Sequence, residues 1–188
     1  KSVAFYASFA QPNKQNYSWN DTFGDSTSAL ATDKTALIID YPMAVKQIRK
    51  ANPSINIATS ALPQTNPDVP NNYGVTLVGS VSKDSKLSEI AWDFWGFATT
   101  KPAQTIFSQN SYWPASRKDL IQEQKNDKDL GVFANQIATA TDWYKGFSYT
   151  TNAELSNMLS YYLTGLDPQI TVKNAATNVT KSIQLSNQ

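Results

Sequence analysis

The chain has 188 residues, of which 40% are apolar and 16% are charged, with a formal net charge of +1. This balance is typical of a folded globular chain, and the near-neutral charge excludes the basic surface that nucleic-acid binding requires. Cysteine and histidine are both absent, which excludes thiolate nucleophiles, imidazole bases, disulfide bonds and the common kinds of zinc site.

The first half of the chain alternates between helical and strand-like patterns. Helices are predicted at residues 2–10, 26–31 and 41–51, and strands at residues 34–40, 55–61 and 73–81. The first strand rests on the apolar run from Ala36 to Ile39, which suits a buried strand. Pro42 suits the first turn of the helix that follows, where its missing N–H costs nothing. Strands placed between helices predict an α/β fold.

The second half of the chain is predicted to be helical. Helices are expected at residues 84–98, 102–109, 116–124, 127–140, 151–164 and from 167 onward. Thr151 and Glu154 have the spacing of a capping box, which predicts a helix start at Thr151. Gly165 is expected to end that helix, and Asp167 with Pro168 to cap and open the last one. The whole chain is therefore α/β, with a small sheet and many helices.

One of these helices is apolar on almost every side. Residues 84–98 carry Trp92, Trp95 and Phe97 in addition to an apolar stripe at helical spacing. A helix that is hydrophobic all round is normally buried. We therefore expect this helix to be buried, with Trp92 and Trp95 in the core.

The polar composition favours an exported protein, because Asn, Ser and Thr are abundant while Lys and Glu are modest. No window approaches the roughly 18–20 apolar residues that a membrane span needs, and residues 1–10 lack the layout of a signal peptide. We expect any export signal to lie upstream of Lys1.

Aromatic residues are concentrated in the predicted loops and at the ends of elements. They are Tyr17, Trp19, Tyr41, Tyr73, Tyr112, Trp113, Trp143, Tyr144, Phe147 and Tyr149. Flat rings with a polar edge can stack on the apolar faces of sugars and can hydrogen-bond to their hydroxyl groups. The alternative for each single ring is that it fills the core or an interface.

The carboxylates occur singly, and no sequence motif pairs two of them. A glycosidase needs two carboxylates about 5–10 Å apart, and the sequence gives no positive sign of such a pair. Asp40 and Asp142 each precede an aromatic residue. We interpret them as acceptors for ligand hydroxyl groups, with capping or solvated roles as the alternative.

Four segments together resemble the family 1 extracellular solute-binding proteins. Residues 33–42 (DKTALIIDYP) resemble the family's Gly-Lys-x-Ala-Met strand, and residues 60–63 (SALP) its strand ending in Leu-Pro. Residues 81–94 resemble its Val-Ser-Lys-x-Ser-Lys…Ala-Trp-x-Phe strand and helix, and residues 113–120 its Pro-x-Arg turn. The chain departs from the family pattern at Asp33, where Gly is usual, and at Leu37, where Met is usual.

The resemblance implies a periplasmic-binding-protein-like (type II) lobe, helix-rich with a small mixed sheet. Family members are roughly twice as long and have two lobes joined by a hinge. This sequence would correspond to the carboxy-terminal half. Residues 1–72 and 113–188 would form the second lobe, and residues 73–112 would cross the hinge and pack on the amino-terminal lobe, which this sequence does not include.

The resemblance also implies a ligand site and a role. Tyr41, with its neighbour Met43, matches a strand end where the family places a ring-stacking aromatic. Trp143 and Tyr144 match a loop in which an aromatic stacks on the sugar, and Trp19 matches another loop aromatic. The set of candidate ligand-binding residues is completed by Tyr73, Trp113 and Asp40.

The implied protein is a non-enzymatic receptor outside the cytoplasm, either periplasmic or a cell-surface lipoprotein. It would close around a mono- or oligosaccharide and deliver it to the membrane subunits of an ABC importer, with no cofactor, metal ion or covalent step. Two alternatives are a fragment of a glycan-active hydrolase and a cell-surface interaction domain.

Overall fold

The structure is a computed structural model that describes residues 1–187, and the chain divides into two compact units. The terminal unit combines residues 1–24 with the chain from Trp143 onward, and the central unit is residues 25–142. Within the described residues, no helix is both long enough and apolar enough to cross a membrane.

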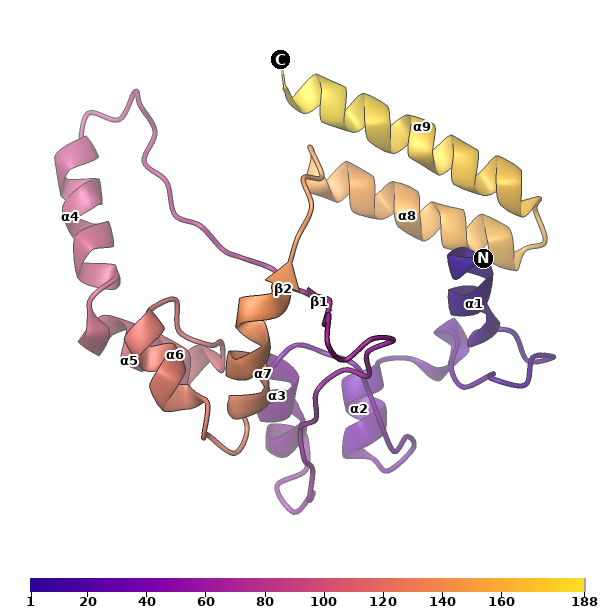
Figure 1. Ribbon diagram of the computed structural model, residues 1–188, viewed down its shortest axis with the longest axis horizontal. Helices are drawn as coiled ribbons and strands as arrows, with labels where there is room; N and C mark the ends of the chain where they lie inside the picture. The colour runs from indigo at the N-terminus through magenta and orange to yellow at the C-terminus, as the bar shows by residue number, and fades with distance from the viewer. Residues whose placement is uncertain (188) are drawn as a thin grey trace. The chain divides into compact units, whose positions relative to one another are not determined.

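The terminal unit is helical. It contains α1 (Ser2–Ser8), the 3₁₀ helix η1 (Asp21–Phe23), α8 (Ser148–Leu163) and α9 (Pro168–Ser186). Figure 1 shows α8 and α9 as an antiparallel pair joined by a short turn. The turn contains Gly165 at a φ of +92°, a conformation that favours glycine. The predicted start of the last helix is confirmed, because the Asp167 carboxylate accepts hydrogen bonds from two amides of the first turn, Gln169 at 2.8 Å and Ile170 at 3.0 Å.

The predicted start of α8 is wrong by three residues. The helix begins at Ser148, so Thr151 lies inside its first turn rather than at a cap. The Thr151 side chain is fully buried, and its hydroxyl donates to the carbonyl of Lys145 at 2.8 Å. Tertiary burial of Thr151 therefore replaced the capping box that the spacing predicted.

The central unit contains most of the short elements. They are α2 (Ser26–Ala31), α3 (Met43–Ala51), β1 (Asn72–Tyr73), α4 (Ser88–Ala98), α5 (Lys101–Ser111), α6 (Lys118–Gln124), α7 (Gly131–Gln136), the 3₁₀ helix η2 (Ile137–Thr139) and β2 (Ala140–Thr141). The two strands pair in parallel, with Asn72 opposite Ala140 and Tyr73 opposite Thr141. The helices follow the predicted order, although their ends shift by a few residues.

Two of the predicted strands form no ladder, and the third is reduced to β1. Residues 34–40 and 55–61 are irregular, so these strand predictions are wrong as secondary structure. Residues 55–60 nevertheless alternate with a period of two, and Ile55 and Ile57 pack on the core, whereas in residues 34–40 only Ile38 reaches the core and Leu37 and Ile39 are more than 70% exposed. An apolar run can turn alternate residues inward by itself, but a ladder also needs a neighbouring strand to accept its hydrogen bonds.

The core of the central unit lies between α2 and α3. Ala31, Ala44 and Ile48 are buried there, and the irregular segments contribute Ile38, Ile55 and Ile57 at its edge. The apolar stripe of α3 that the sequence predicted, Ala44, Val45 and Ile48, is confirmed as its buried face. This packing fixes the start of α3, where the candidate site begins.

The prediction that the 84–98 helix is buried is wrong. No residue of α4 is buried, and Trp92 is 58% exposed, so Trp92 does not belong to the core. Trp95 is half-buried, and it lies so close to Gly79 that a Cβ added there would overlap its indole ring. Within the described chain, only one face of α4 is partly buried, because few other segments of the chain pack against this helix.

Candidate functional site

Two of the predicted ligand-binding aromatics, Tyr41 and Trp113, lie together in the central unit. Their ring centroids are 6.1 Å apart and the ring planes differ by 15°, so the rings are nearly parallel. Tyr41 precedes α3 and is 42% exposed, while Trp113 follows α5 and is half-buried. The structure thus brings together two rings that are far apart in the sequence, with part of their surface open to solvent.

Asp40 is the residue immediately before Tyr41 in the chain. One Asp40 carboxylate oxygen accepts a hydrogen bond from the backbone N–H of Tyr41 at 2.7 Å. The carboxylate has a second oxygen and further lone pairs, so it can still accept from a ligand hydroxyl group. A sugar lying on the two rings is the kind of ligand that could supply such a hydroxyl group.

Lys46 and Tyr112 connect α3 to the end of α5. The Lys46 ammonium group donates to the carbonyl of Asn110 at 2.6 Å and lies 5.7 Å from the centroid of the Tyr112 ring. Tyr112 itself has a φ of +59°, a left-handed conformation that ends α5 and turns the chain towards Trp113. These contacts hold the two segments that carry Tyr41 and Trp113.

A second link between segments of this unit is ionic. Arg49, in the last turn of α3, makes a bidentate pair with Asp129, in which one bond measures 2.8 Å. This hydrogen bond is the main reason why the pKa of Arg49 is raised above its ordinary value, and the Tyr112 side chain adds to the same effect while burial opposes it. The guanidinium therefore stays charged and anchors α3 to the chain before α7.

The other predicted site residues are distributed between the two units. Tyr73 belongs to the central unit, in β1, and 51% of its surface is exposed. Trp143, Tyr144 and Trp19 belong to the terminal unit. The Trp19 ring lies 4.9 Å from that of Phe23, which is local packing.

Trp143 and Tyr144 begin the segment that leads into α8. Trp143 is 45% exposed, and the Lys145 ammonium group lies 5.9 Å from its ring centroid. The Tyr144 hydroxyl group forms hydrogen bonds with the side chains of Ser186 at 2.9 Å and Asn187 at 3.0 Å. These bonds tie the segment to the end of α9 and leave 60% of Tyr144 exposed.

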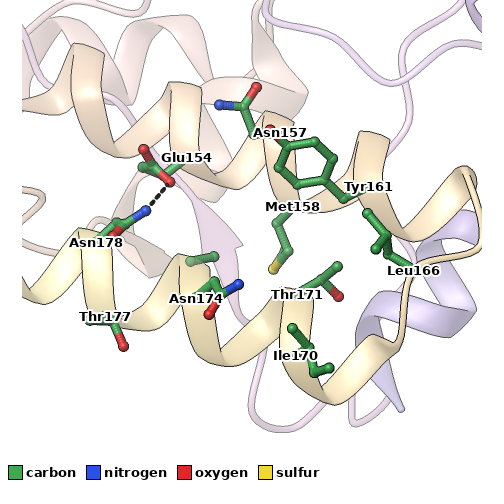
Figure 2. A pocket seen from close by; sticks show the side chains of 11 residues that line it. Glu154, Asn157, Met158, Tyr161, Leu166, Ile170, Thr171, Asn174, Thr177 and Asn178 are labelled. Carbon is green, nitrogen blue, oxygen red and sulfur yellow. Dashed lines mark hydrogen bonds between the residues drawn. The ribbon is translucent and has the colours of Figure 1, made fainter.

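The terminal unit also has a groove that the sequence reasoning missed. It lies between α8 and α9, has a volume of about 420 Å³, and is lined by both polar and apolar side chains (Figure 2). Across it, the Asn178 amide donates to the Glu154 carboxylate at 2.8 Å. The spacing of Glu154, Asn157, Met158 and Tyr161 on one helix face could have indicated it, but Glu154 was interpreted as part of a capping box.

Acidic side chains are dispersed. Within residues 1–187, no group of three or more carboxylates lies close enough together to hold a metal ion. The candidate site in the central unit therefore consists of two rings, one carboxylate and hydrogen-bonding groups, an arrangement suited to binding a neutral polar solute.

No family model matches the chain. The chain is similar to binding proteins. Three curated relatives, all named "putative binding protein", come from Brucella abortus strain 2308, Brucella abortus biovar 1 strain 9-941 and Brucella suis biovar 1 strain 1330. Each is 25% identical over 174 residues, which cover 88% of this chain and 40% of the relative. The chain thus spans about two fifths of the length of these relatives.

Proposed function

We propose that the chain is part of an extracytoplasmic solute receptor that binds a carbohydrate-like solute and delivers it to an ABC importer. The observation that carries this proposal is the nearly parallel pair of Tyr41 and Trp113, with the Asp40 carboxylate beside it. The similarity to proteins named as binding proteins supports the receptor role. The proposal that the solute is a sugar rests on the family resemblance and on the chemistry of the rings. The proposal that an importer receives it rests on the family resemblance.

The chemistry of the ring pair suits a sugar. Sugars present apolar C–H faces that stack on aromatic rings, and hydroxyl edges that need hydrogen-bond partners. By analogy with base stacking, each ring contributes on the order of 1–3 kcal/mol. Tyr41 and Trp113 offer the rings, and Asp40, whose carboxylate is bound to the Tyr41 backbone, offers an acceptor.

In this proposal the chain supplies one side of a cleft between two lobes of type II architecture. Residues 1–72 and 113–188 would form the second lobe, and residues 73–112 would pack on an amino-terminal lobe. The exposed apolar surface of α4 is consistent with such a contact. By the family resemblance, Trp19, Tyr73, Trp143 and Tyr144 remain candidate ligand contacts.

The test is isothermal titration of the full-length protein against glucose, xylose, maltose, raffinose and glycerol. Tyr41→Ala and Trp113→Ala should each weaken binding of the sugar that binds by about fivefold to a hundredfold, which corresponds to the loss of one stacked ring. Tyr149→Ala is the matched control, because Tyr149 is an aromatic in the other unit that is 89% exposed. Binding of none of these compounds, or unchanged binding by both ring variants, would contradict the proposal.

A second candidate, an interaction domain at the cell surface, is favoured by one observation. Large apolar side chains are exposed along α4, among them Ile90, Trp92, Phe94 and Phe97. Contiguous exposed apolar surface marks contact sites between proteins. Sedimentation velocity of residues 1–188 and of a Trp92→Ser, Phe97→Ser variant tests this: self-association of the wild type that the variant loses, together with no sugar binding by the full-length protein, would favour this candidate.

A further inference from the structure

The position of Trp113 depends on the short turn between α5 and α6. Tyr112 ends α5 in a left-handed conformation, and the chain then passes through residues 113–117 before α6 begins at Lys118. A turn of this kind can aim the Trp113 side chain in more than one direction. The contacts that fix its backbone therefore decide where the indole ring lies.

Two side chains hold this turn from inside, the buried Ser108 and the partly buried Gln124. Ser108 of α5 is 1% exposed, and its hydroxyl group donates to the carbonyl of Trp113 at 2.5 Å. The same hydroxyl group accepts a hydrogen bond from the Gln124 side-chain amide, also at 2.5 Å. The Gln124 carbonyl oxygen accepts from the backbone N–H of Ala115 at 2.9 Å, and Ala115 is fully buried.

Gln124 thus acts on the backbone that follows Trp113, on both sides of Pro114, with its two amide atoms. It acts on the carbonyl of Trp113 through Ser108, and on the amide of Ala115 directly. This arrangement needs one side chain that donates and accepts at the same time, which glutamine provides and glutamate or leucine does not. Since Ala115 is fully buried, losing Gln124 would leave the backbone N–H of Ala115 without this hydrogen-bond partner.

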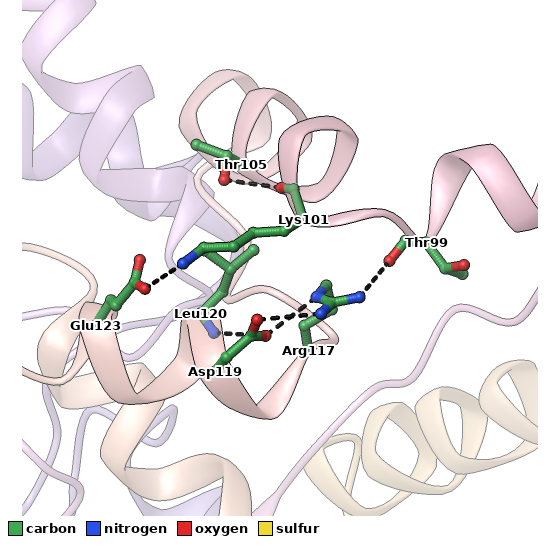
Figure 3. A network of polar contacts seen from close by, with 7 residues as sticks. All are labelled: Thr99, Lys101, Thr105, Arg117, Asp119, Leu120 and Glu123. Carbon is green, nitrogen blue, oxygen red and sulfur yellow. Dashed lines mark hydrogen bonds and ion pairs between the residues drawn. The ribbon is translucent and has the colours of Figure 1, made fainter.

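The rest of the turn is fixed from the α5 side. The Gln104 carbonyl oxygen accepts from the Ser116 hydroxyl group at 2.8 Å, and the Gln104 amide donates to the carbonyl of Ala98 at 2.9 Å. Figure 3 shows the neighbouring ionic contacts, in which Arg117 donates to the carbonyl of Thr99 and pairs with Asp119. The contacts of Gln104 with Ser116 and of Arg117 with Thr99 are exposed, whereas the buried Ser108 hydroxyl group bonds to Trp113 itself.

We infer that Ser108 and Gln124 are positioning residues for the candidate sugar site: they hold the Trp113 backbone so that its indole ring lies parallel to Tyr41. This inference rests on the proposed function for its consequence in binding. Its structural part, the orientation of the indole ring, can be measured without any ligand.

The first experiment uses the full-length protein labelled with 5-fluorotryptophan and observed by fluorine NMR. The Trp113 signal is assigned by its loss in Trp113→Phe, because the chain has five tryptophans. Gln124→Leu and Ser108→Ala should shift or broaden that signal and leave those of Trp19 and Trp143 in place. Gln122→Leu is the matched control, an exposed glutamine on the same helix. An unchanged Trp113 signal in both variants overturns the inference.

Ser108→Ala keeps the experiment decisive if Gln124→Leu does not fold, since it removes one hydroxyl group and little volume. A change confined to the melting temperature, with no movement of the Trp113 signal, would mean a purely structural role and would also overturn the inference.

The second experiment links the positioning to binding, with maltose as the probe. Gln124→Leu should weaken maltose binding when it is made in the wild-type protein. When it is made in the Trp113→Ala variant, it should weaken binding by less than about twofold, because both changes act through the same ring. Equal weakening in both backgrounds would contradict positioning through Trp113. Trp113→Ala could leave maltose binding unchanged while Gln124→Leu and Ser108→Ala move the Trp113 fluorine signal as expected. In that case Trp113 does not contact the sugar, which contradicts the proposed function, and the positioning role of Ser108 and Gln124 stands.

Discussion

Breaking the pair of Arg49 and Asp129 should destabilise the central unit more than breaking any other ion pair that the described residues form. The pair joins α3 to the chain before α7, across 80 residues of sequence, with a bidentate geometry. Its side chains are only 32% and 15% exposed. Exposed pairs contribute about 0.2–1 kcal/mol, whereas removing one partner of a buried pair costs about 3–5 kcal/mol. The half-buried pair lies between these limits, so we expect a coupling of about 1–2 kcal/mol.

The measurement is a double-mutant cycle by urea denaturation with Arg49→Met, Asp129→Asn and the double variant. The control cycle uses Lys101 and Glu123, whose side chains are 48% and 57% exposed, and it should give a smaller coupling that salt reduces further. A coupling below about 0.3 kcal/mol for Arg49 and Asp129, which is within ordinary additivity, would refute the reasoning.

Three further predictions concern local features. Asp33 has a φ of +57°, so Asp33→Ala should lower the free energy of unfolding by about 1 kcal/mol relative to Asp33→Gly in urea denaturation; equal stabilities would contradict this. The pKa of Asp119 is lowered chiefly by the hydrogen bond from Arg117, so its stabilisation is present above about pH 4 and is lost as the pH falls through the folded-state pKa. Thermal melts of wild type and Asp119→Asn should therefore converge at low pH, and a constant difference would argue against the ion pair. Asp167→Ala should cost about 1 kcal/mol of stability, while Asp167→Asn should cost little, as judged by urea denaturation.

Structural features that depend on residues close together in the sequence could be predicted from the sequence. The start of α9 follows from Asp167 and Pro168, and the inward face of α3 follows from the spacing of its apolar residues. Asp33 has a positive φ, a conformation that Asp adopts more readily than most residues other than glycine. Each of these features depends on a few consecutive residues, so the local sequence contains the information.

Features that depend on distant partners were decided by the tertiary structure alone. The apolar runs at 34–40 and 55–61 read as strands, yet a ladder requires a second strand, and none pairs with them in the described chain. The apolar helix α4 was predicted to be buried, yet burial requires other elements to cover it, and few of its neighbours do. The candidate site follows the same rule. The sequence indicated which loop aromatics were candidates, but it did not show that Tyr41 and Trp113 lie parallel to each other. Their approach, and its support by Ser108 and Gln124, exist only because the fold brings α3, α5 and α6 together.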